Sequence, residues 1–136
     1  MEEVYLDSNV FIFAANDNDP KSIKARKLLT SILKNELIGA TSVLSIDEFV
    51  WKISKIVNNR NLAIQEGLRI LDFRNLKVFS VDNLVMKIAF DFMLKYNFLK
   101  PRDAIHLAVA YSNGIKLIIS DDSEFDKIKE VKRRAL

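Results

Sequence analysis

The sequence predicts a single α/β domain over residues 1–136, with three layers in which helices cover both faces of a central parallel sheet. Short apolar runs alternate with longer segments of helical periodicity, which is the order that parallel strands and their crossover helices produce. The first run, Val4–Leu6, has no polar alternation, so we expect helices to bury both faces of this strand. Three glycines and two prolines in the whole chain leave little room for a linker between domains.

Local signals mark the ends of the predicted elements. The Asn-Asp-Asn-Asp-Pro segment at residues 16–20 predicts a loop. Ser45 opens the Ser-x-x-Glu pattern of a capping box, which predicts a helix that begins there. Pro101 suits the first turn of a helix, and Asn113-Gly114 suits its C-terminal cap. Apolar residues recur at every fourth position from Leu84 to Tyr96, which predicts a wide buried face on that helix.

The expected elements follow one another without a long interruption. The tail, residues 130–136, fits either a short edge strand or a solvated end. In order, we expect a strand at Val4–Leu6, a short helix or turn at Val10–Ala15, a helix capped by Ser22, a strand at Leu37–Thr41, a helix from Ser45 with a core stripe ending at Val57, a helix from Leu62 to about Phe73 capped by Asn61, a strand at Leu76–Val81, a helix from Asn83, a helix from Pro101 to Ser112, and a strand at Ile115–Ser120.

Composition narrows the possible chemistry. No cysteine is present, which excludes disulfides and thiolate metal sites and leaves oxygen atoms or the single histidine, His106, as metal ligands. The net charge of +3 and the pI near 9.1 permit a polyanionic partner without requiring one. Apolar runs such as Val10–Ala15 are far too short to cross a bilayer, so we expect a cytoplasmic protein without a membrane partner.

Four carboxylates are predicted to meet at one edge of the sheet. Asp7 ends the first strand and Asp122 follows the strand at 115–120, while Glu48 and Asp103 are expected in the first turns of two helices. In a parallel α/β fold the strands end, and the following helices begin, at the same edge, and ligands bind there where the strand order reverses. We therefore expect these four side chains to face one crevice.

Carboxylates so close together raise one another's pKa and favour a bound cation. Hard oxygen ligands without cysteine or a histidine pair indicate Mg²⁺ or Mn²⁺. Such an ion polarises a phosphoryl oxygen and generates hydroxide at neutral pH, so an acidic crevice on a mildly basic chain predicts phosphodiester cleavage. The basic residues Lys52, Lys100 and Arg102 flank the expected crevice and fit contacts to RNA phosphates, although a solvated face explains them equally well.

Each acid by itself also fits a purely structural role. Glu48 fits a capping box with Ser45, and Asp103 fits the favourable negative charge at the start of a helix. Asp7 and Asp122 fit the turns that end strands. Taken together, these roles require four independent coincidences at one edge of the sheet, which favours a shared site.

These motifs resemble those of the PIN domain, a family of small metal-dependent ribonucleases with a Rossmann-like fold. The resemblance rests on the order and spacing of four segments, and it covers nearly the whole chain: Leu6–Val10, Ser45–Glu48, Pro101–Ala110 and Ser120–Asp126. It implies a PIN-like fold with Mg²⁺ or Mn²⁺ as cofactor. The implied site consists of Asp7, Glu48, Asp103 and Asp122 as metal-binding and catalytic residues, with Ser8 and Ser120 in supporting positions.

Two acids near the end of the chain are less central in this resemblance. Asp122 is preferred over its neighbour Asp121, because the family pattern has a hydroxyl residue, any residue and then Asp. Glu124 stands where many members have a second Asp, and we expect it to lie beside the site without binding metal.

Among PIN domains, a single compact domain of this size resembles the toxin halves of VapBC-type toxin–antitoxin pairs. This implies an endoribonuclease that acts on an RNA substrate, forms a homodimer and is silenced by a small antitoxin protein. The alternatives are a housekeeping RNA-processing nuclease and a catalytically inactive module that binds RNA or protein on the same fold. A phosphotransferase of the haloacid dehalogenase type is disfavoured because Asn9 stands where its second Asp is required.

Two further residues lie one helical turn from predicted site acids. A lone histidine on a buried helix is usually a core residue, so we expect His106 to pack in the core, with a place in the crevice as the alternative. For Trp51 we also expect core packing, with base stacking or a dimer contact as alternatives. Asp17 and Asp19 lack the glycine and terminal glutamate of a calcium loop and are expected to be turn residues.

Overall fold

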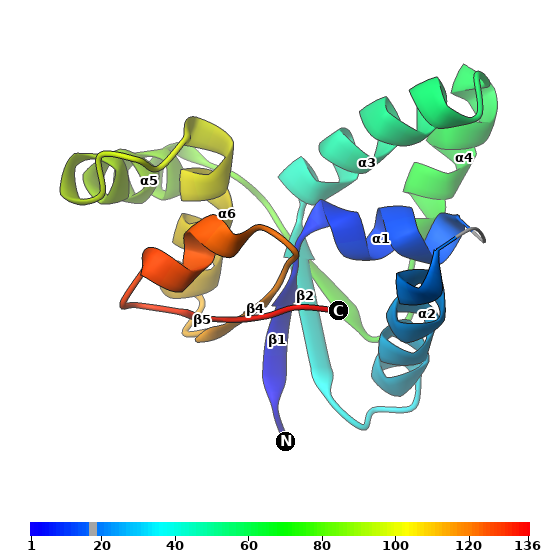
Figure 1. The fold of residues 1–136 in the computed structure, drawn as a ribbon, viewed down its shortest axis with the longest axis horizontal. Coiled ribbons are helices and arrows are strands. Elements are labelled where there is room, and N and C mark those ends of the chain that lie inside the picture. Colours follow the sequence, from blue (N-terminus) through cyan, green and yellow to red (C-terminus); the bar gives the residue numbers. More distant parts are fainter. Residues whose placement is uncertain (17–18) are drawn as a thin grey trace.

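A parallel sheet of five strands runs through the part of the chain that the structure describes, residues 1–16 and 19–136 of a computed structural model (Figure 1). The strands lie in the order β3-β2-β1-β4-β5, and every neighbouring pair is parallel. The chain therefore adds β2 and β3 on one side of β1 and then crosses to add β4 and β5 on the other side. The strands are β1 (Glu3–Leu6), β2 (Ile38–Ser42), β3 (Leu76–Phe79), β4 (Leu117–Ile119) and β5 (Lys132–Arg134).

Helices cover both faces of this sheet. Helices α1 to α4 lie on one side of it, and α5 and α6 lie on the other, with the short 3-10 helix η1 following β4 (Figure 1). This arrangement confirms the predicted three-layer α/β/α fold with a central parallel sheet. The helices are α1 (Ser8–Ala15), α2 (Pro20–Leu33), α3 (Val43–Ile56), α4 (Arg60–Leu71), α5 (Asn83–Lys95), α6 (Pro101–Ser112) and η1 (Ser123–Lys127).

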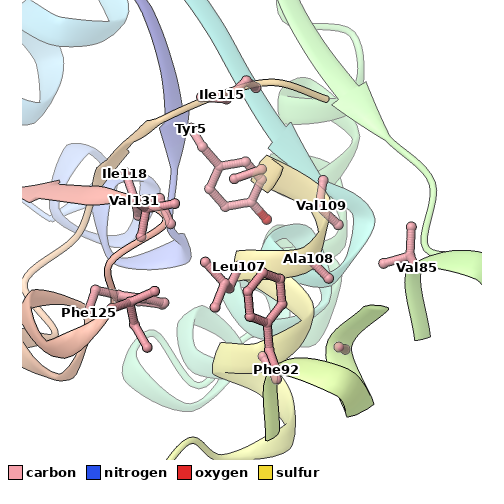
Figure 2. Packing of buried hydrophobic residues seen from close by; sticks show 14 of the residues in the cluster. Tyr5, Val85, Phe92, Leu107, Ala108, Val109, Ile115, Ile118, Phe125 and Val131 are labelled. Carbon is pink, nitrogen blue, oxygen red and sulfur yellow. The ribbon is translucent and has the colours of Figure 1, made fainter. Parts of the chain in front are cut away.

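Strand β1 is buried between the two helical layers. Val4 and Leu6 belong to the apolar cluster under α1 to α4, whereas Tyr5 points to the opposite face, toward Leu107 of α6 (Figure 2). All three strand side chains are fully buried, as the unbroken apolar run predicted. Burying an aliphatic side chain of this size stabilises a fold by roughly 1.5–3 kcal/mol, so both layers contribute to holding β1.

The strand order creates a crevice at the carboxyl end of β1. The chain leaves β1 toward β2 and later returns to the other side of β1 with β4, so the connections diverge between these two strands. Asp7 directly follows β1, and its backbone N–H donates to the carbonyl oxygen of Ile119 in β4 at 3.1 Å. In open parallel sheets this point of divergence is where ligands bind.

For two helices the predicted N-cap residue lies C-terminal to the residue that caps the helix in the structure. Helix α2 is capped by Asp19, whose side chain accepts a first-turn N–H at 2.9 Å, and not by Ser22, which is fully buried. Pro20 fills the first helical position, where its fixed φ suits the start of a helix. Helix α4 is capped by Asn59 rather than Asn61. In both cases the residue with extended backbone, not the next polar residue, can reach the free N–H groups.

Helix α3 also begins earlier than predicted. It starts at Val43, after Ser42, so the expected capping box at Ser45 is wrong. Ser45 is fully buried, and its hydroxyl donates to the carbonyl oxygen of Leu6 at 3.4 Å, which ties α3 to the end of β1. Glu48 consequently lies in the second turn of α3 rather than in the first.

Three predicted core residues are exposed. Leu84 is 63% exposed, because the buried face of α5 begins one residue later and consists of Val85, Ala89 and Phe92. Val57 is 43% exposed just after the end of α3. Trp51 is 61% exposed, so the expectation that it packs in the core is wrong.

Other boundaries differ by a few residues. Strand β3 ends at Phe79 rather than Val81, and β4 is limited to Leu117–Ile119. The tail forms the edge strand β5, which pairs with β4, so of the two readings of residues 130–136 the strand is confirmed. Asp17 and Asn18, in the middle of the predicted loop, lie outside the described residues. No helix of the described part has both the length and the apolar sequence that crossing a membrane would require.

Gly39 of β2 lies directly against helix α2. A β-carbon at Gly39 would lie 2.4 Å from Cδ1 of Ile32, whose side chain is fully buried. We therefore expect Gly39→Ala to lower the free energy of unfolding by about 1–3 kcal/mol through overpacking. Urea denaturation followed by circular dichroism measures the change.

The double variant Gly39→Ala/Ile32→Ala is the control for this contact. Ile32→Ala alone is expected to destabilise the fold by about 2–5 kcal/mol, but it also removes the atoms that the new methyl group would meet. The combined loss should then be smaller than the sum of the single losses. Strictly additive losses would show that the two side chains do not meet.

Candidate functional site

Acidic side chains from four separate elements meet at the carboxyl edge of the sheet. Asp7 caps α1 directly after β1, Glu48 projects from α3, Asp103 lies in the first turn of α6, and Asp122 caps η1 after β4. Two adjoining hollows open here. The acidic hollow, of about 490 Å³, is lined by Glu48, Lys100, Pro101, Arg102, Asp103 and Asp122. The outer hollow, of about 560 Å³, is lined by Ser8, Asn9, Ile12, Asp47, Glu48, Trp51, Lys52 and Arg102.

Both carboxylate oxygens of Asp7 are held by hydrogen bonds. Asp7 is only 7% exposed, and its Oδ1 accepts the backbone N–H of Ser8 at 2.7 Å. Its Oδ2 accepts the hydroxyl of the fully buried Ser120 at 2.7 Å. The Ser120 hydroxyl in turn accepts the backbone N–H of Asp122 at 3.0 Å. Ser120 thus connects the acid after β1 with the loop that carries the acid after β4.

His106 links Glu48 to the core of the protein. Its Nε2 lies 2.6 Å from Oε1 of Glu48 and 3.5 Å from Oδ1 of Asp7. Its Nδ1 lies 2.7 Å from the hydroxyl of Tyr5, which donates to Oγ of Ser42 at 2.8 Å. The histidine is 1% exposed, so it is buried as expected, but it also contacts two site acids. The series of hydrogen bonds from Ser42 through Tyr5 and His106 therefore holds Glu48 in place from the core side of the site.

Electrostatics distinguish His106 from an ordinary core histidine. Burial works against its charged form, but Tyr5, the hydrogen bond to Glu48 and the charge of Asp7 outweigh burial and hold the pKa of His106 well above its usual value. At neutral pH a positive ring beneath the acids offsets part of their mutual repulsion.

Asp103 experiences that repulsion most clearly. Burial and the negative charges of Asp122, Asp7 and Glu48 raise the pKa of Asp103 to about 6, although His106 acts in the opposite direction. The shift shows that these acids share one electrostatic environment. Without a cation, the ionised form of Asp103 is therefore destabilised at neutral pH.

Two nearby acids lie outside both hollows. Asp121 forms an ion pair with Lys21 at 2.6 Å and does not line either of them. Oε2 of Glu124 lies 3.4 Å from Nζ of Lys127, and the Glu124 side chain is substantially exposed. Its own backbone N–H donates to Asp122 at 3.0 Å, so Glu124 helps to hold the loop of that acid.

Basic side chains surround the acids on the outside. Arg102 lines both hollows, Lys100 lines the acidic hollow, and Lys52 lines the outer hollow. All three are exposed, and within residues 1–16 and 19–136 none of them has a carboxylate partner. Ser8 lies beside them in the outer hollow. The rim can therefore attract an anion while the floor holds a cation.

The donor set fits a hard divalent cation. Carboxylate oxygens of Asp7 and Glu48 and a ring nitrogen of His106 all lie within 4.8 Å of one another, and the positively charged ring orients Glu48 rather than binding the cation itself. Asp103 and Asp122 are not members of this tight group, but they share the acidic hollow with Glu48. Carboxylate oxygens are the ligands that Mg²⁺ and Mn²⁺ prefer, and the raised pKa of Asp103 is the shift that a bound cation would reverse.

Sequence reasoning missed the hydrogen-bonded chain beneath Glu48. One signal was available, because Tyr5 stands in an otherwise aliphatic strand and a buried tyrosine hydroxyl needs a partner. The partner, His106, is 101 residues away along the chain, so only the fold brings the two together.

A comparison with protein families extends over nearly the whole of this fold. The family model of the PIN domain matches residues 4–131. The chain belongs to the PIN domain family. Curated PIN relatives include a VapC ribonuclease of Mycobacterium bovis and the ribonuclease VapC13 of Mycobacterium tuberculosis. Each is 27% identical to this chain over 132 residues, which cover 97% of this chain and 99% of the relative.

Solved structures show the same PIN architecture. VapC20 of Mycobacterium tuberculosis, described as a toxin that cleaves the sarcin-ricin loop, matches with a TM-score of 0.76 at 16% identity, over 93% of this chain and 95% of that one. DNA-bound VapBC of Salmonella typhimurium matches with a TM-score of 0.69 at 22% identity, over 99% and 98%. At these identities the likeness establishes a common fold.

We expect Asp103→Asn to stabilise the metal-free protein at neutral pH. The folded-state pKa of about 6 lies above the ordinary value of 3.8, so ionisation of Asp103 destabilises the fold progressively between these pH values and fully above them. Because Asp103 is only half-buried, solvent screening limits the expected gain to about 1 kcal/mol. Urea denaturation in EDTA at pH 4.5 and 7.5 should show a larger gain at pH 7.5.

The exposed acid Asp91 of α5 provides a matched control. Asp91→Asn removes the same charge from a side chain that does not line the acidic hollow, and it should give no gain that grows with pH. If Asp103→Asn instead loses stability at pH 7.5, Asp103 acts as the negative charge that favours the start of α6.

Proposed function

We propose that this protein is an endoribonuclease that cleaves RNA phosphodiester bonds by metal-activated water. The observation that carries this proposal is the convergence of acids from β1, α3, α6 and η1 beneath a basic rim. Membership of the PIN domain family and the similarity to VapC ribonucleases support it. An acidic floor and a basic rim together suit a phosphate group that must be held and attacked.

The side chains of this site have separable roles in the proposal. A bound Mg²⁺ or Mn²⁺ supplies Lewis-acid activation of phosphate and water. Two hydrogen bonds, from the hydroxyl of Ser120 and the backbone N–H of Ser8, orient the proposed ligand Asp7. His106 orients the proposed ligand Glu48. The exposed cations offer phosphate contacts. The proposed ligands are Asp7, Glu48, Asp103 and Asp122, and the proposed RNA contacts are Arg102, Lys100 and Lys52.

Adjacent acids provide a sharp test of the assignment. Asp122→Asn is expected to lower the rate of RNA cleavage roughly 10³-fold in Mg²⁺ or Mn²⁺, because a lost ligand removes several kcal/mol of transition-state stabilisation. Asp121→Asn removes the same charge from the same loop but leaves the lining of the hollow intact, so it should retain most of the activity. Electrophoresis of end-labelled RNA measures both rates.

Chelation tests the metal dependence independently of the loop. EDTA and Asp7→Asn should each stop cleavage by protein that remains folded. RNA that is bound but never cut under any metal would identify an inactive binding module on the same fold. Equal losses in Asp121→Asn and Asp122→Asn would remove Asp122 from the site.

We further propose that the nuclease is the toxin of a toxin–antitoxin pair rather than a housekeeping RNA-processing enzyme. The VapC names of its relatives support this. An apolar groove of about 220 Å³ also lies among α1, α2, α3 and α4 and fits the apolar side chains of a small partner protein. Its apolar lining includes Phe11, Leu29, Phe49, Ile70 and Phe73.

Expression in a bacterial host tests the toxin assignment. Induction should arrest growth, Asp7→Asn should not, and co-expression of a short neighbouring reading frame should restore growth. Sequencing of RNA ends after induction identifies the cleaved RNA. Unimpaired growth on expression of an active enzyme would favour the housekeeping nuclease.

We also propose that the protein forms a homodimer. Exposed apolar side chains on α5 support this, since Leu94 is 86% exposed, Leu84 63% and Phe90 52%. Phe90 and Leu94 lie one helical turn apart on α5, so their exposed side chains fit a contact between two protomers. Analytical ultracentrifugation gives the mass in solution and decides between monomer and dimer.

A further inference from the structure

Trp51 lies on the surface between two hollows. It is the only tryptophan of the chain, and 61% of it is exposed on α3, one helical turn after Glu48. On one side it lines the outer hollow together with Glu48 and Arg102. On the other it lines a third hollow, of about 530 Å³, beside Asn58, Asn59 and Arg60 at the turn between α3 and α4. The ring therefore stands beside a path that leads away from the site acids.

Exposed cations accompany this path on both sides of Trp51. Arg102 and Lys52 line the outer hollow, and Arg60 lines the third. The ammonium group of Lys55 lies over the Trp51 ring, 4.0 Å from its centroid. The opposing charges are Asp47, which lines both hollows, and Glu48, which lines the outer one. Cations beside an exposed aromatic ring are the combination with which proteins bind single-stranded nucleic acid.

We propose that Trp51 is a stacking platform for one unpaired base of the RNA, next to the phosphate that is cleaved at the acids. This inference rests on the proposed ribonuclease function and adds to it a side chain, Trp51, that binds a base of the substrate. The phosphates on either side of the stacked base lie beside Arg102 and Lys52 in the outer hollow and beside Arg60 in the third. A base in a duplex keeps its stacking partners and cannot use the ring.

The lining favours RNA over a protein partner. Most of the residues that line the two hollows are polar or charged, with Ile12, Val50 and Ile64 as the aliphatic exceptions. An apolar protein face laid over Trp51 would bury Lys52 and Arg102 without partners, which is strongly unfavourable. A phosphate backbone supplies those partners and leaves the base free to cover the ring.

The single tryptophan allows binding to be measured directly. In the Asp7→Asn protein with Mg²⁺, a short single-stranded RNA should quench Trp51 fluorescence in a saturable manner, while the same sequence annealed into a duplex should not. Binding of the single strand by anisotropy without any change in Trp51 fluorescence would overturn the proposal. Fluorescence that changes with protein concentration alone and ignores RNA would assign the ring to a contact between copies and would overturn it as well.

Kinetics of the active enzyme provide the second measurement. Trp51→Ala should raise KM for a single-stranded RNA about 5- to 150-fold with little change in kcat, and Trp51→Phe should restore most of the loss. Leu68→Ala, which removes an exposed apolar side chain from α4, is the control and should behave as wild type. Unchanged KM in Trp51→Ala, with wild type active, overturns the inference but leaves the nuclease function intact, whereas an inactive wild type contradicts the function itself.

An RNA lacking one base identifies the stacked position. A single abasic nucleotide near the cut should raise KM for the wild type as much as Trp51→Ala does, and it should have no further effect in that variant. Losses that add fully in the combination would show that the missing base and Trp51 do not touch.

Discussion

Repulsion between carboxylates is the constraint around which the carboxyl edge of this PIN domain is built. Four acids from distant parts of the chain share one electrostatic environment. The raised pKa of Asp103 indicates that the folded chain retains the repulsion between them. The parallel sheet enforces the arrangement, because β1 and β4 are neighbours and their carboxyl ends cannot separate. Free energy from the two apolar clusters must therefore offset the unfavourable charge.

Hydrogen bonds convert this crowding into a defined geometry. Ser120 holds one oxygen of Asp7 and the backbone of Asp122, so the acids after β1 and β4 move together. His106 holds Glu48 and is itself held by Tyr5. A site supported from the core in this way is preorganised, which matters for any reaction that depends on placing charge.

Features that depend on local sequence signals were predicted well, whereas helix boundaries and side-chain partners that depend on tertiary contacts were predicted less well. The apolar run of β1 and the turn acids predicted the layers, the parallel sheet and the gathering of the four acids. The start of α3 was wrong because the hydroxyl of Ser45 bonds to β1 rather than to its own helix. Trp51 was misplaced because a large aromatic side chain favours burial, whereas its position lies off the buried face of α3, which includes Ile46 and Phe49. The partners of His106 follow only from long-range pairing.

The last strand, β5, also supports the site. Arg133 in β5 binds Asp126 through two hydrogen bonds of 2.9 Å and donates to the carbonyl oxygen of Ser120 at 3.1 Å. Asp7 follows the first strand of the sheet, whereas the arginine that completes its surroundings belongs to the last strand, β5. The site is therefore complete only after β5 has paired with β4, so an incompletely folded chain does not yet hold its acids in place.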